Sequence, residues 1–211
     1  MRDRKNGKLD RLKIDSLYFY NIGPVDITLC RSESIGITGP SGAGKTLFLR
    51  AVADIDDHSG NLFLDGKESR EFQPNIWRRE VSMLPSESSW WFDSVGEHFN
   101  NINKIWLEML GFDYTVLKWN VSRLSSGERQ RLALLRLLSN NPKVLLLDEP
   151  TANLDIKNAL KVEKILTIYI VETESSMIWA GHDIEQLKRI SERQFIIKKG
   201  VLQAMPEASF F

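Results

Sequence analysis

The sequence has 211 residues, of which 42% are hydrophobic, and its 28 basic residues equal its 28 acidic ones in number. A chain of this length and composition can bury one substantial core, and it is predicted to form a single domain or a domain with an insert. Its balanced charge provides no broad basic field, so nucleic acid is not expected among its partners.

Cysteine content and hydropathy predict a protein of the reducing cytosol. Cys30 is the single cysteine, which excludes an internal disulfide. No apolar run approaches the roughly 20 residues that cross a bilayer, and residues 1–10 are too charged for a secretory signal. A basic stretch near the start is expected to be a solvated tail rather than a contact with an anionic membrane, because no apolar face accompanies it. Its members are Arg2, Arg4, Lys5, Lys8, Arg11 and Lys13.

The first 85 residues read mainly as strands. Apolar stretches bounded by turn residues predict strands at residues 12–20, 25–29, 34–38, 61–66 and 80–84. A turn is expected at 21–24, where Asn, Gly and Pro come together. A helix is expected at 46–54, where good helix formers follow a glycine-rich segment.

The remaining chain alternates helices and strands after a helical interruption. Residues 94–117 are predicted to be largely helical, followed by a helix at 126–138. The expected order is then strand, helix, strand, helix and a strand pair, at residues 144–147, 156–173, 176–180, 184–190 and 195–203. Almost continuously apolar strands between amphipathic helices predict an α/β fold with a mainly parallel sheet covered on both faces.

A phosphate-binding loop is predicted between the strand at 34–38 and the helix that follows. Eight residues match the pattern GxxxxGK[ST], namely Gly39, Pro40, Ser41, Gly42, Ala43, Gly44, Lys45 and Thr46. The glycines let backbone N–H groups point inward at the helix N-terminus, where they can bind the phosphates of ATP. Lys45 is expected to reach the β and γ phosphates, and the Thr46 hydroxyl to ligate Mg²⁺.

Two carboxylates follow the apolar strand at 144–147, at the sheet edge where ligands bind in open α/β folds. Asp148 is expected to hold the Mg²⁺ shell, and Glu149 to orient or deprotonate the attacking water as general base. A strand that simply ends in a polar turn is the alternative. With the phosphate loop upstream, the pattern favours a P-loop nucleotide hydrolase.

The segment Leu124-Ser-Ser-Gly-Glu128 precedes Arg-Gln-Arg and an apolar-periodic helix, and it resembles the LSGGE signature of ABC ATPases. Ser125 and the Gly127 amide, at a helix N-terminus, are suited to hold a γ-phosphate. Ser125 with Glu128 also matches a capping box, and the two roles are compatible. In the family the phosphate belongs to the other protomer, so the resemblance implies two ATP molecules held in a head-to-tail dimer.

Two further segments resemble ABC motifs in the family's order. Residues 151–155 look like the D-loop, which implies dimer contacts for Asn153, Leu154 and Asp155. Residues 179–183 look like the switch-histidine segment, in which His182 would touch the γ-phosphate and hold the water in line with Glu149. A lone surface histidine is the alternative.

The resemblance covers most of the chain and implies one ABC ATPase domain over residues 1–211. Residues 12–85 and 141–211 would form the core, with antiparallel strands at its start, and about 86–140 a helical subdomain that carries the signature. The family's properties imply hydrolysis of ATP to ADP and phosphate with Mg²⁺, and a separate multi-span membrane subunit. They also imply a position on the cytoplasmic face of the inner or plasma membrane.

The sequence departs from the family pattern at two positions. Ser126 replaces a glycine, which is mild because Ser125 and Gly127 remain. Ser86 replaces the glutamine that normally ligates Mg²⁺ and links nucleotide state to the membrane subunit, which puts coupling at this loop in question. We expect Ser86 to reach Mg²⁺ only through water, unless Glu87 or a main-chain carbonyl has taken over the ligand role.

Aromatic residues at two places have two possible roles each. Tyr20 or Phe19 would stack on adenine, as in the family's aromatic loop, or pack within a strand. Trp90, Trp91 and Phe92 follow the altered loop, where they would form a groove for a helix of the membrane subunit or pack inside the helical subdomain.

The predicted function is that of an ATP-hydrolysing subunit of an ABC transporter, similar to small bacterial ATPase subunits assigned to iron or metal export. A non-transport ABC ATPase acting on nucleic acid or ribosomes is the alternative, but such proteins usually carry long coiled-coil inserts or two ATPase domains. A regulatory module without hydrolysis is disfavoured by Lys45, Asp148, Glu149 and His182.

Overall fold

The computed structural model describes residues 9–206. Four residues of the basic stretch lie outside the described residues: Arg2, Arg4, Lys5 and Lys8. Arg11 corrects the prediction of a solvated tail, because it is buried in a strand and pairs with Asp65 at 2.6 Å. Within residues 9–206, no helix combines the length and apolar character that a bilayer crossing requires.

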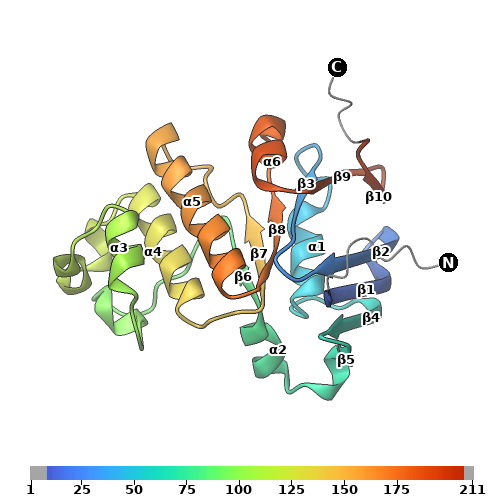
Figure 1. Cartoon of the computed structure of the whole chain (residues 1–211), viewed down its shortest axis with the longest axis horizontal. Coiled ribbons are helices and arrows are strands. Elements are labelled where there is room, and N and C mark those ends of the chain that lie inside the picture. The colour runs from blue at the N-terminus through green and yellow to red at the C-terminus, as the bar shows by residue number, and fades with distance from the viewer. Residues whose placement is uncertain (1–8, 207–211) are drawn as a thin grey trace.

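A six-stranded sheet forms the centre of the fold, in the order β10-β9-β3-β8-β7-β6 (Figure 1). Its strands are β3 Ser34–Thr38, β6 Val81–Leu84, β7 Val144–Asp148, β8 Ser176–Ala180, β9 Arg193–Lys198 and β10 Val201–Ala204. All neighbours are parallel except β9 and β10. The predicted mainly parallel sheet is confirmed, and β3, β7 and β8 are buried along their whole length.

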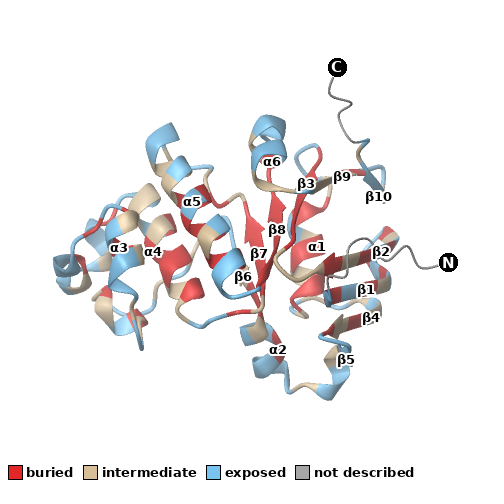
Figure 2. Ribbon diagram, in the orientation of Figure 1, coloured by how far each residue is buried: buried red, intermediate tan, exposed pale blue. Residues whose placement is uncertain are grey.

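Helices cover both faces of this sheet, as its continuously apolar strands require (Figure 2). Along β7, Leu146 packs with α1 (Lys45–Val52), whereas Leu145 and Leu147 pack with α4 (Ser126–Leu138) and α5 (Ile156–Glu172). The residues therefore alternate between two hydrophobic cores. Helix α6 (Ile184–Ile190) packs against β3 and β9.

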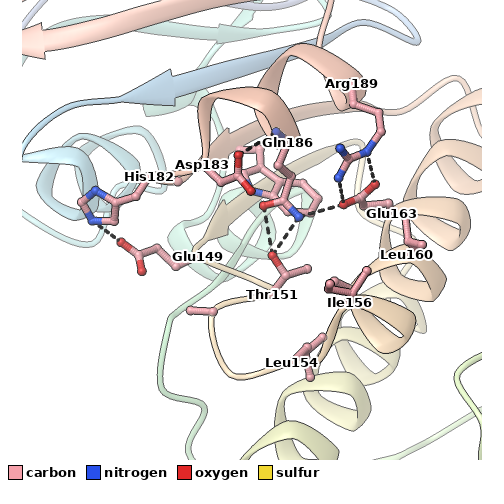
Figure 3. Close-up of a pocket in the computed structure, with 14 residues that line it drawn as sticks. Glu149, Thr151, Leu154, Ile156, Leu160, Glu163, His182, Asp183, Gln186 and Arg189 are labelled. Atoms are coloured by element: carbon pink, nitrogen blue, oxygen red, sulfur yellow. Dashed lines mark hydrogen bonds and ion pairs between the residues drawn. The ribbon is translucent and has the colours of Figure 1, made fainter.

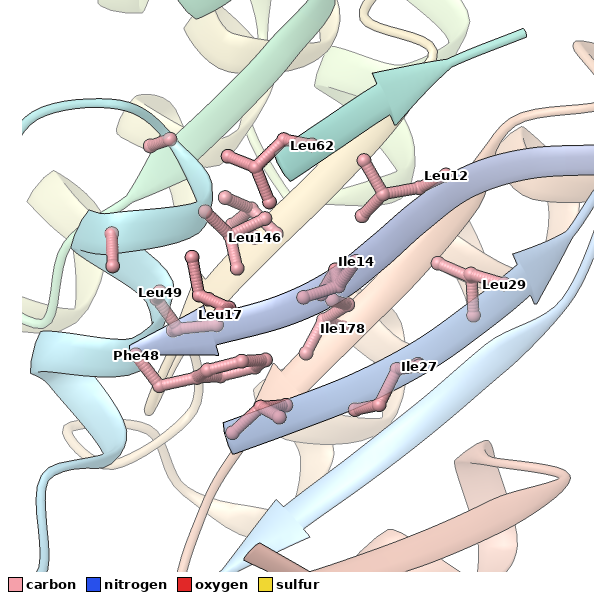
Figure 4. Packing of buried hydrophobic residues seen from close by; sticks show 14 of the residues in the cluster. Leu12, Ile14, Leu17, Ile27, Leu29, Phe48, Leu49, Leu62, Leu146 and Ile178 are labelled. Carbon is pink, nitrogen blue, oxygen red and sulfur yellow. The ribbon is translucent and has the colours of Figure 1, made fainter. Parts of the chain in front are cut away.

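A second, antiparallel sheet lies on the far side of α1, in the order β2-β1-β4-β5. Its strands are β1 Asp10–Phe19, β2 Ile22–Cys30, β4 Ser59–Leu64 and β5 Lys67–Glu68. Figure 4 shows Ile14 and Leu17 of β1 packed towards Phe48 of α1, together with Leu146 and Ile178 of the parallel sheet. Helix α1 is thus held between the two sheets, and this packing fixes the phosphate loop at its N-terminus.

The predicted turn at 21–24 is corrected to Tyr20 and Asn21, because Phe19 of β1 already pairs with Ile22 of β2. Pro24 therefore lies inside β2, after a cis peptide bond from Gly23. A proline is tolerated there because β2 is the edge strand of its sheet.

Residues 94–117 are much less helical than predicted. They contain α3 (Lys104–Met109) and two 3₁₀ turns, Gly96–His98 and Tyr114–Lys118, and a further turn follows at Val121–Arg123. Polar caps explain the fragmentation, since Asn103, Asp113 and Asn120 each accept a hydrogen bond from a backbone N–H just downstream and start a new turn. One further helix, α2 (Pro74–Glu80), was not predicted.

Candidate active site

The phosphate loop occupies the bend between β3 and α1, and its backbone requires glycine at two positions. At Gly39, φ is +151° and a Cβ would lie 2.6 Å from Ile197 O. At Gly44, φ is +103° and a Cβ would lie 2.3 Å from Ile22 Cδ1. Residues 40–42 are exposed, so the bend is open to a ligand in front of the α1 N-terminus.

Lys45 is buried at the floor of this bend. Its ammonium donates to Gly39 O at 2.9 Å and to Pro40 O at 3.3 Å. Burial lowers the pKa of Lys45, although the nearby carboxylates of Glu149 and Asp148 oppose the shift. The side chain is therefore a cation held by two neutral carbonyl oxygens, and an anionic phosphate would be a stronger partner.

Thr46 and Asp148 meet where α1 and β7 come together. The Thr46 hydroxyl donates to Asp148 Oδ2 at 2.9 Å, and Asp148 is buried at the end of its strand. Burial raises the pKa of Asp148, against the opposing effect of the Thr46 hydrogen bond. A hydroxyl and a carboxylate at this spacing are hard oxygen donors that fit a magnesium ion, whose charge would also offset the burial of Asp148.

Glu149 and His182 face each other (Figure 3). His182 Nε2 lies 2.8 Å from Glu149 Oε1 and 3.3 Å from Lys45 Nζ. A carboxylate can only accept, so the shorter contact places a proton on Nε2, which donates to Glu149. Glu149 has φ of +49°, and its backbone N–H donates to Ala180 O at 2.9 Å, which holds this turn against the segment that carries His182.

The signature residues form the N-terminus of α4. Ser125 is the N-cap, and its backbone N–H and hydroxyl each donate to Glu128 Oε2 at 2.8 Å. These bonds lower the pKa of Glu128. The capping box is thus confirmed, and Ser125 and Ser126 remain exposed. Gly127 packs on the D-loop, since a Cβ there would lie 3.0 Å from Asn153 O.

A cavity of about 310 Å³ opens behind the D-loop, between α5 and α6 (Figure 3). Leu154 lines it, together with Glu149 and His182, so the predicted D-loop and hydrolysis residues share one hollow. Asn153 and Asp155 flank it, and Asp155 caps α5 through Asn158 N at 2.8 Å.

The sequence interpretation missed three polar residues of this cavity. Glu163, Gln186 and Arg189 line it and form a hydrogen-bonded cluster with Thr151. Their spacing in the sequence matches no motif. The signal that the sequence offered was Glu163, a charged residue on the apolar face of the predicted helix at 156–173.

The two candidate adenine-stacking residues are separated by the structure. Phe19 is buried and packs on Phe48, with ring centroids 5.8 Å apart. Tyr20 is 69% exposed and lines a hollow with Ile55 and residues 56–57. Of the two, only Tyr20 is free to meet a base.

Ser86 lies two residues beyond Leu84, which pairs with Leu147 in the sheet and places the loop near Asp148. The three aromatic residues that follow differ in their exposure to solvent. Trp90 packs against the core of the helical region, whereas Trp91 is 62% and Phe92 47% exposed.

Comparison with known proteins agrees with these motifs. A family model described as ABC transporter matches residues 22–152. The chain belongs to the ABC transporter family. It is 32% identical over 179 residues to the probable iron export ATP-binding protein FetA of Escherichia coli, covering 77% of this chain and 78% of that protein. An uncharacterized ABC transporter ATP-binding protein of Methanocaldococcus jannaschii is 28% identical over 95% of this chain and 76% of its own length.

Solved structures show the same fold. A dimeric post-hydrolysis state of the ATP-binding cassette MJ0796, bound to ADP and Pi, superimposes with a TM-score of 0.78 at 21% identity, over 94% of this chain and 100% of that one. Clostridium perfringens cbiO1, part of the transporter complex cbiONQ, gives 0.76 at 25% identity, over 92% and 87%. The chain is thus an ABC-type ATPase that binds ATP.

Proposed function

We propose that this ABC ATPase powers a membrane transporter by hydrolysing Mg-ATP at sites shared between two copies. The separation of the two half-sites within one chain carries the proposal. Lys45, Glu149 and His182 gather at one place, whereas Gly127 lies against the D-loop. Within residues 9–206, no hydrogen bond or ion pair joins residues 125–128 to the phosphate loop, which supports a signature supplied by a second chain.

In this proposal ATP lies along the N-terminus of α1. The backbone of Gly39, Pro40, Ser41, Gly42, Ala43 and Gly44 binds its phosphates, together with Lys45 and Thr46. Lys45 exchanges its two carbonyl partners for β and γ phosphate oxygens. Tyr20, exposed next to the hollow at Ile55, stacks on the adenine.

Thr46 and Asp148 are the proposed magnesium ligands, with Ser86 reaching the ion through water. When bound, Mg²⁺ would supply positive charge to offset that of the β and γ phosphates. The Thr46 hydroxyl donates its hydrogen to Asp148, so its oxygen lone pairs would be available to the ion. The Asp148 carboxylate, whose pKa is raised by burial, would hold its negative charge at lower free-energy cost beside a divalent cation.

Hydrolysis uses Glu149 and His182 as a pair. Glu149 accepts a proton from the attacking water while the water oxygen forms a bond to the γ phosphorus. The bond between that phosphorus and the bridging oxygen breaks, and ADP leaves with this oxygen. His182, freed from Glu149 by the arriving nucleotide, donates its Nε2–H to a γ-phosphate oxygen. Lys45 balances the charge that builds up on the phosphate oxygens.

The second half of each site comes from the signature of the partner copy in this proposal. Ser125, Ser126, Gly127 and Glu128 form an exposed helix start that is suited to a phosphate. Asn153, Leu154 and Asp155 would contact the partner across the dimer. The dimeric arrangement of MJ0796 with ADP and Pi supports this assembly, since the two proteins share their fold.

A separate multi-span membrane subunit is the proposed partner of the dimer, which places the ATPase on the cytoplasmic face of the membrane. The named relatives are ATP-binding proteins of transporters, including an iron export protein. Trp91 and Phe92 provide an exposed apolar patch in the helical subdomain of residues 86–140, where such a subunit could dock.

Replacing Glu149 by Gln tests the shared-site proposal. The variant should bind ATP, turn over at least about 100-fold more slowly, and sediment as a dimer with Mg-ATP, because the base is lost while the shape is kept. Ser125→Arg is the matched control, since it blocks the signature and should keep Glu149→Gln monomeric. A double variant that still dimerises with Mg-ATP would refute the shared site.

A further inference from the structure

A hydrogen-bonded cluster behind the D-loop joins three segments of the chain (Figure 3). Gln186 of α6 donates from Nε2 to Glu163 Oε1 of α5 at 2.8 Å, and its amide nitrogen and oxygen lie 3.0 Å and 3.1 Å from Thr151 Oγ1. Arg189 donates two hydrogen bonds to the same carboxylate, from Nε to Oε2 at 2.9 Å and from Nη2 to Oε1 at 2.8 Å. The cluster therefore connects Thr151, the first residue of the D-loop, to helices α5 and α6.

The chemistry of the cluster allows only one arrangement of the Gln186 amide. Glu163 is a buried carboxylate that accepts from both Arg189 and Gln186. Burial opposes its ionisation, yet these donors hold the pKa of Glu163 below its usual range. The amide nitrogen must therefore face Glu163, which leaves Oε1 to accept from the Thr151 hydroxyl at 3.1 Å.

The cluster touches both halves of the hydrolysis site at short range along the chain. Thr151 is two residues beyond Glu149, and the backbone of Gln186 donates to Asp183 Oδ1 at 3.0 Å, next to His182. Beyond Thr151, the D-loop carries Asn153, whose carbonyl packs on the signature residue Gly127. Gln186 thus contacts the start of the D-loop, which runs from the Glu149 turn to the carbonyl of Asn153 at the signature, and it also contacts Asp183 beside His182.

We propose that Gln186 is a positioning residue for ATP hydrolysis. Clamped by Glu163 and Arg189, it holds Thr151, and through this bond it sets the Glu149 carboxylate opposite His182 and the D-loop against the signature. The inference rests on the roles proposed above for Glu149 and His182. It adds a specific hydrogen bond, Gln186 to Thr151, on which the rate of the chemical step depends.

Steady-state ATPase kinetics on three variants tests the inference. Gln186→Met and Thr151→Val should each lower kcat about tenfold while KM for ATP stays within about twofold, because the chemical geometry changes and the phosphate loop does not. The double variant should be no slower than the slower single one, since both remove the same bond. Thr167→Val is the matched control. It also deletes a threonine hydroxyl bond on α5, to Glu163 O at 3.0 Å, but leaves the Glu163 carboxylate alone.

Gln186→Glu adds a readout that a purely structural role would not move. At neutral pH the new carboxylate repels Glu163, so kcat should fall; on acidification it takes up a proton and can donate to Glu163 again. The ratio of variant to wild-type kcat should therefore rise as pH falls from 8 to 6. A ratio that stays constant would overturn the inference.

The remaining outcomes separate this inference from the proposed function. Wild-type turnover equal to that of Glu149→Gln would refute the hydrolysis site itself. If the wild type is active and Gln186→Met has the same kcat as the wild type, only the positioning role is refuted. Additive losses in the double variant, or an equal loss in Thr167→Val, would likewise overturn it, because they would show a general effect on folding instead of one shared bond.

Discussion

Replacing Lys45 by Met should weaken ATP binding without weakening the fold. The methionine keeps the length and apolar stem of the lysine, so the packing of this buried position is largely preserved. It removes the ammonium that donates to Gly39 O and Pro40 O. Burial already lowers the pKa of Lys45, so the folded state penalises this charge, and the free energy of unfolding should stay unchanged or rise.

The size of the binding loss follows from the exchange of partners. An ammonium and a phosphate charge about 4 Å apart interact by roughly 4 kcal/mol at an effective dielectric constant of about 20. The two bonds to neutral carbonyls that Lys45 gives up offset about 1 kcal/mol of this gain. A net loss of about 3 kcal/mol corresponds to an approximately 100-fold higher Kd for ATP.

Isothermal titration with ATP, ADP and AMP gives the decisive measurement, with urea unfolding of the same samples. The loss should be largest for ATP, smaller for ADP and negligible for AMP, because the ammonium reaches the β and γ phosphates. Lys164→Met on the exposed side of α5 is the control and should change neither quantity. Equal losses for all three nucleotides, or unchanged ATP binding, would refute the assignment of the phosphate loop.

Four further variants probe the metal site, the core and the loss of stability at acidic pH. Ser86→Gln should lower the Mg²⁺ concentration for half-maximal ATPase several-fold, by about 1 kcal/mol; if Glu87 is the ligand instead, Glu87→Ala should raise it, and a magnesium titration separates the two. Tyr169→Phe should cost about 1 kcal/mol in urea unfolding, because its buried hydroxyl donates to Pro142 O at 2.9 Å and burial raises its pKa to about 12. The pKa of Glu163 is lowered in the folded protein, so its carboxylate stabilises the fold at pH values above the ordinary carboxyl pKa. This contribution to the free energy of unfolding is lost as pH falls through the pKa of the folded state. Glu163→Gln should therefore flatten the decline of Tm between about pH 5 and 3.

Local patterns predicted the parallel core because each element carries its own signal. The helix at 126–138, the strand at 176–180 and the helix at 184–190 have the predicted bounds in the structure. Apolar period and cap residues act within a few positions of the chain, so the sequence reports them directly. The phosphate loop was equally readable, because its glycines and its lysine serve one ligand.

The errors occurred where distant contacts decide the structure. Pro24 reads as a turn residue, and only the edge position of β2 lets it lie in a strand. The error at residues 94–117 is the exception, because there the apolar spacing favours a helix while local caps at Asn103 and Asp113 restart the chain in short turns. Arg11 resembles tail charge until Asp65, far along the chain, appears beside it. The same holds for the bond from Gln186 to Thr151, which spans 35 residues and belongs to no motif.

Ser86 raises the question of how this chain would pass nucleotide state to a membrane subunit without the family's glutamine, and α4 provides a physical answer. The helix begins at the signature N-cap Ser125, and near its other end Arg136 lies 4.7 Å from the rings of both Trp90 and Trp91. Arg136 also donates to Ser89 O at 3.0 Å. A helix of 13 residues is a rigid rod of about 20 Å, so under the proposed function a signature drawn towards a partner's ATP would move the exposed aromatic patch with it. Coupling by this route depends on the stacking of Arg136 and is independent of any side chain at position 86.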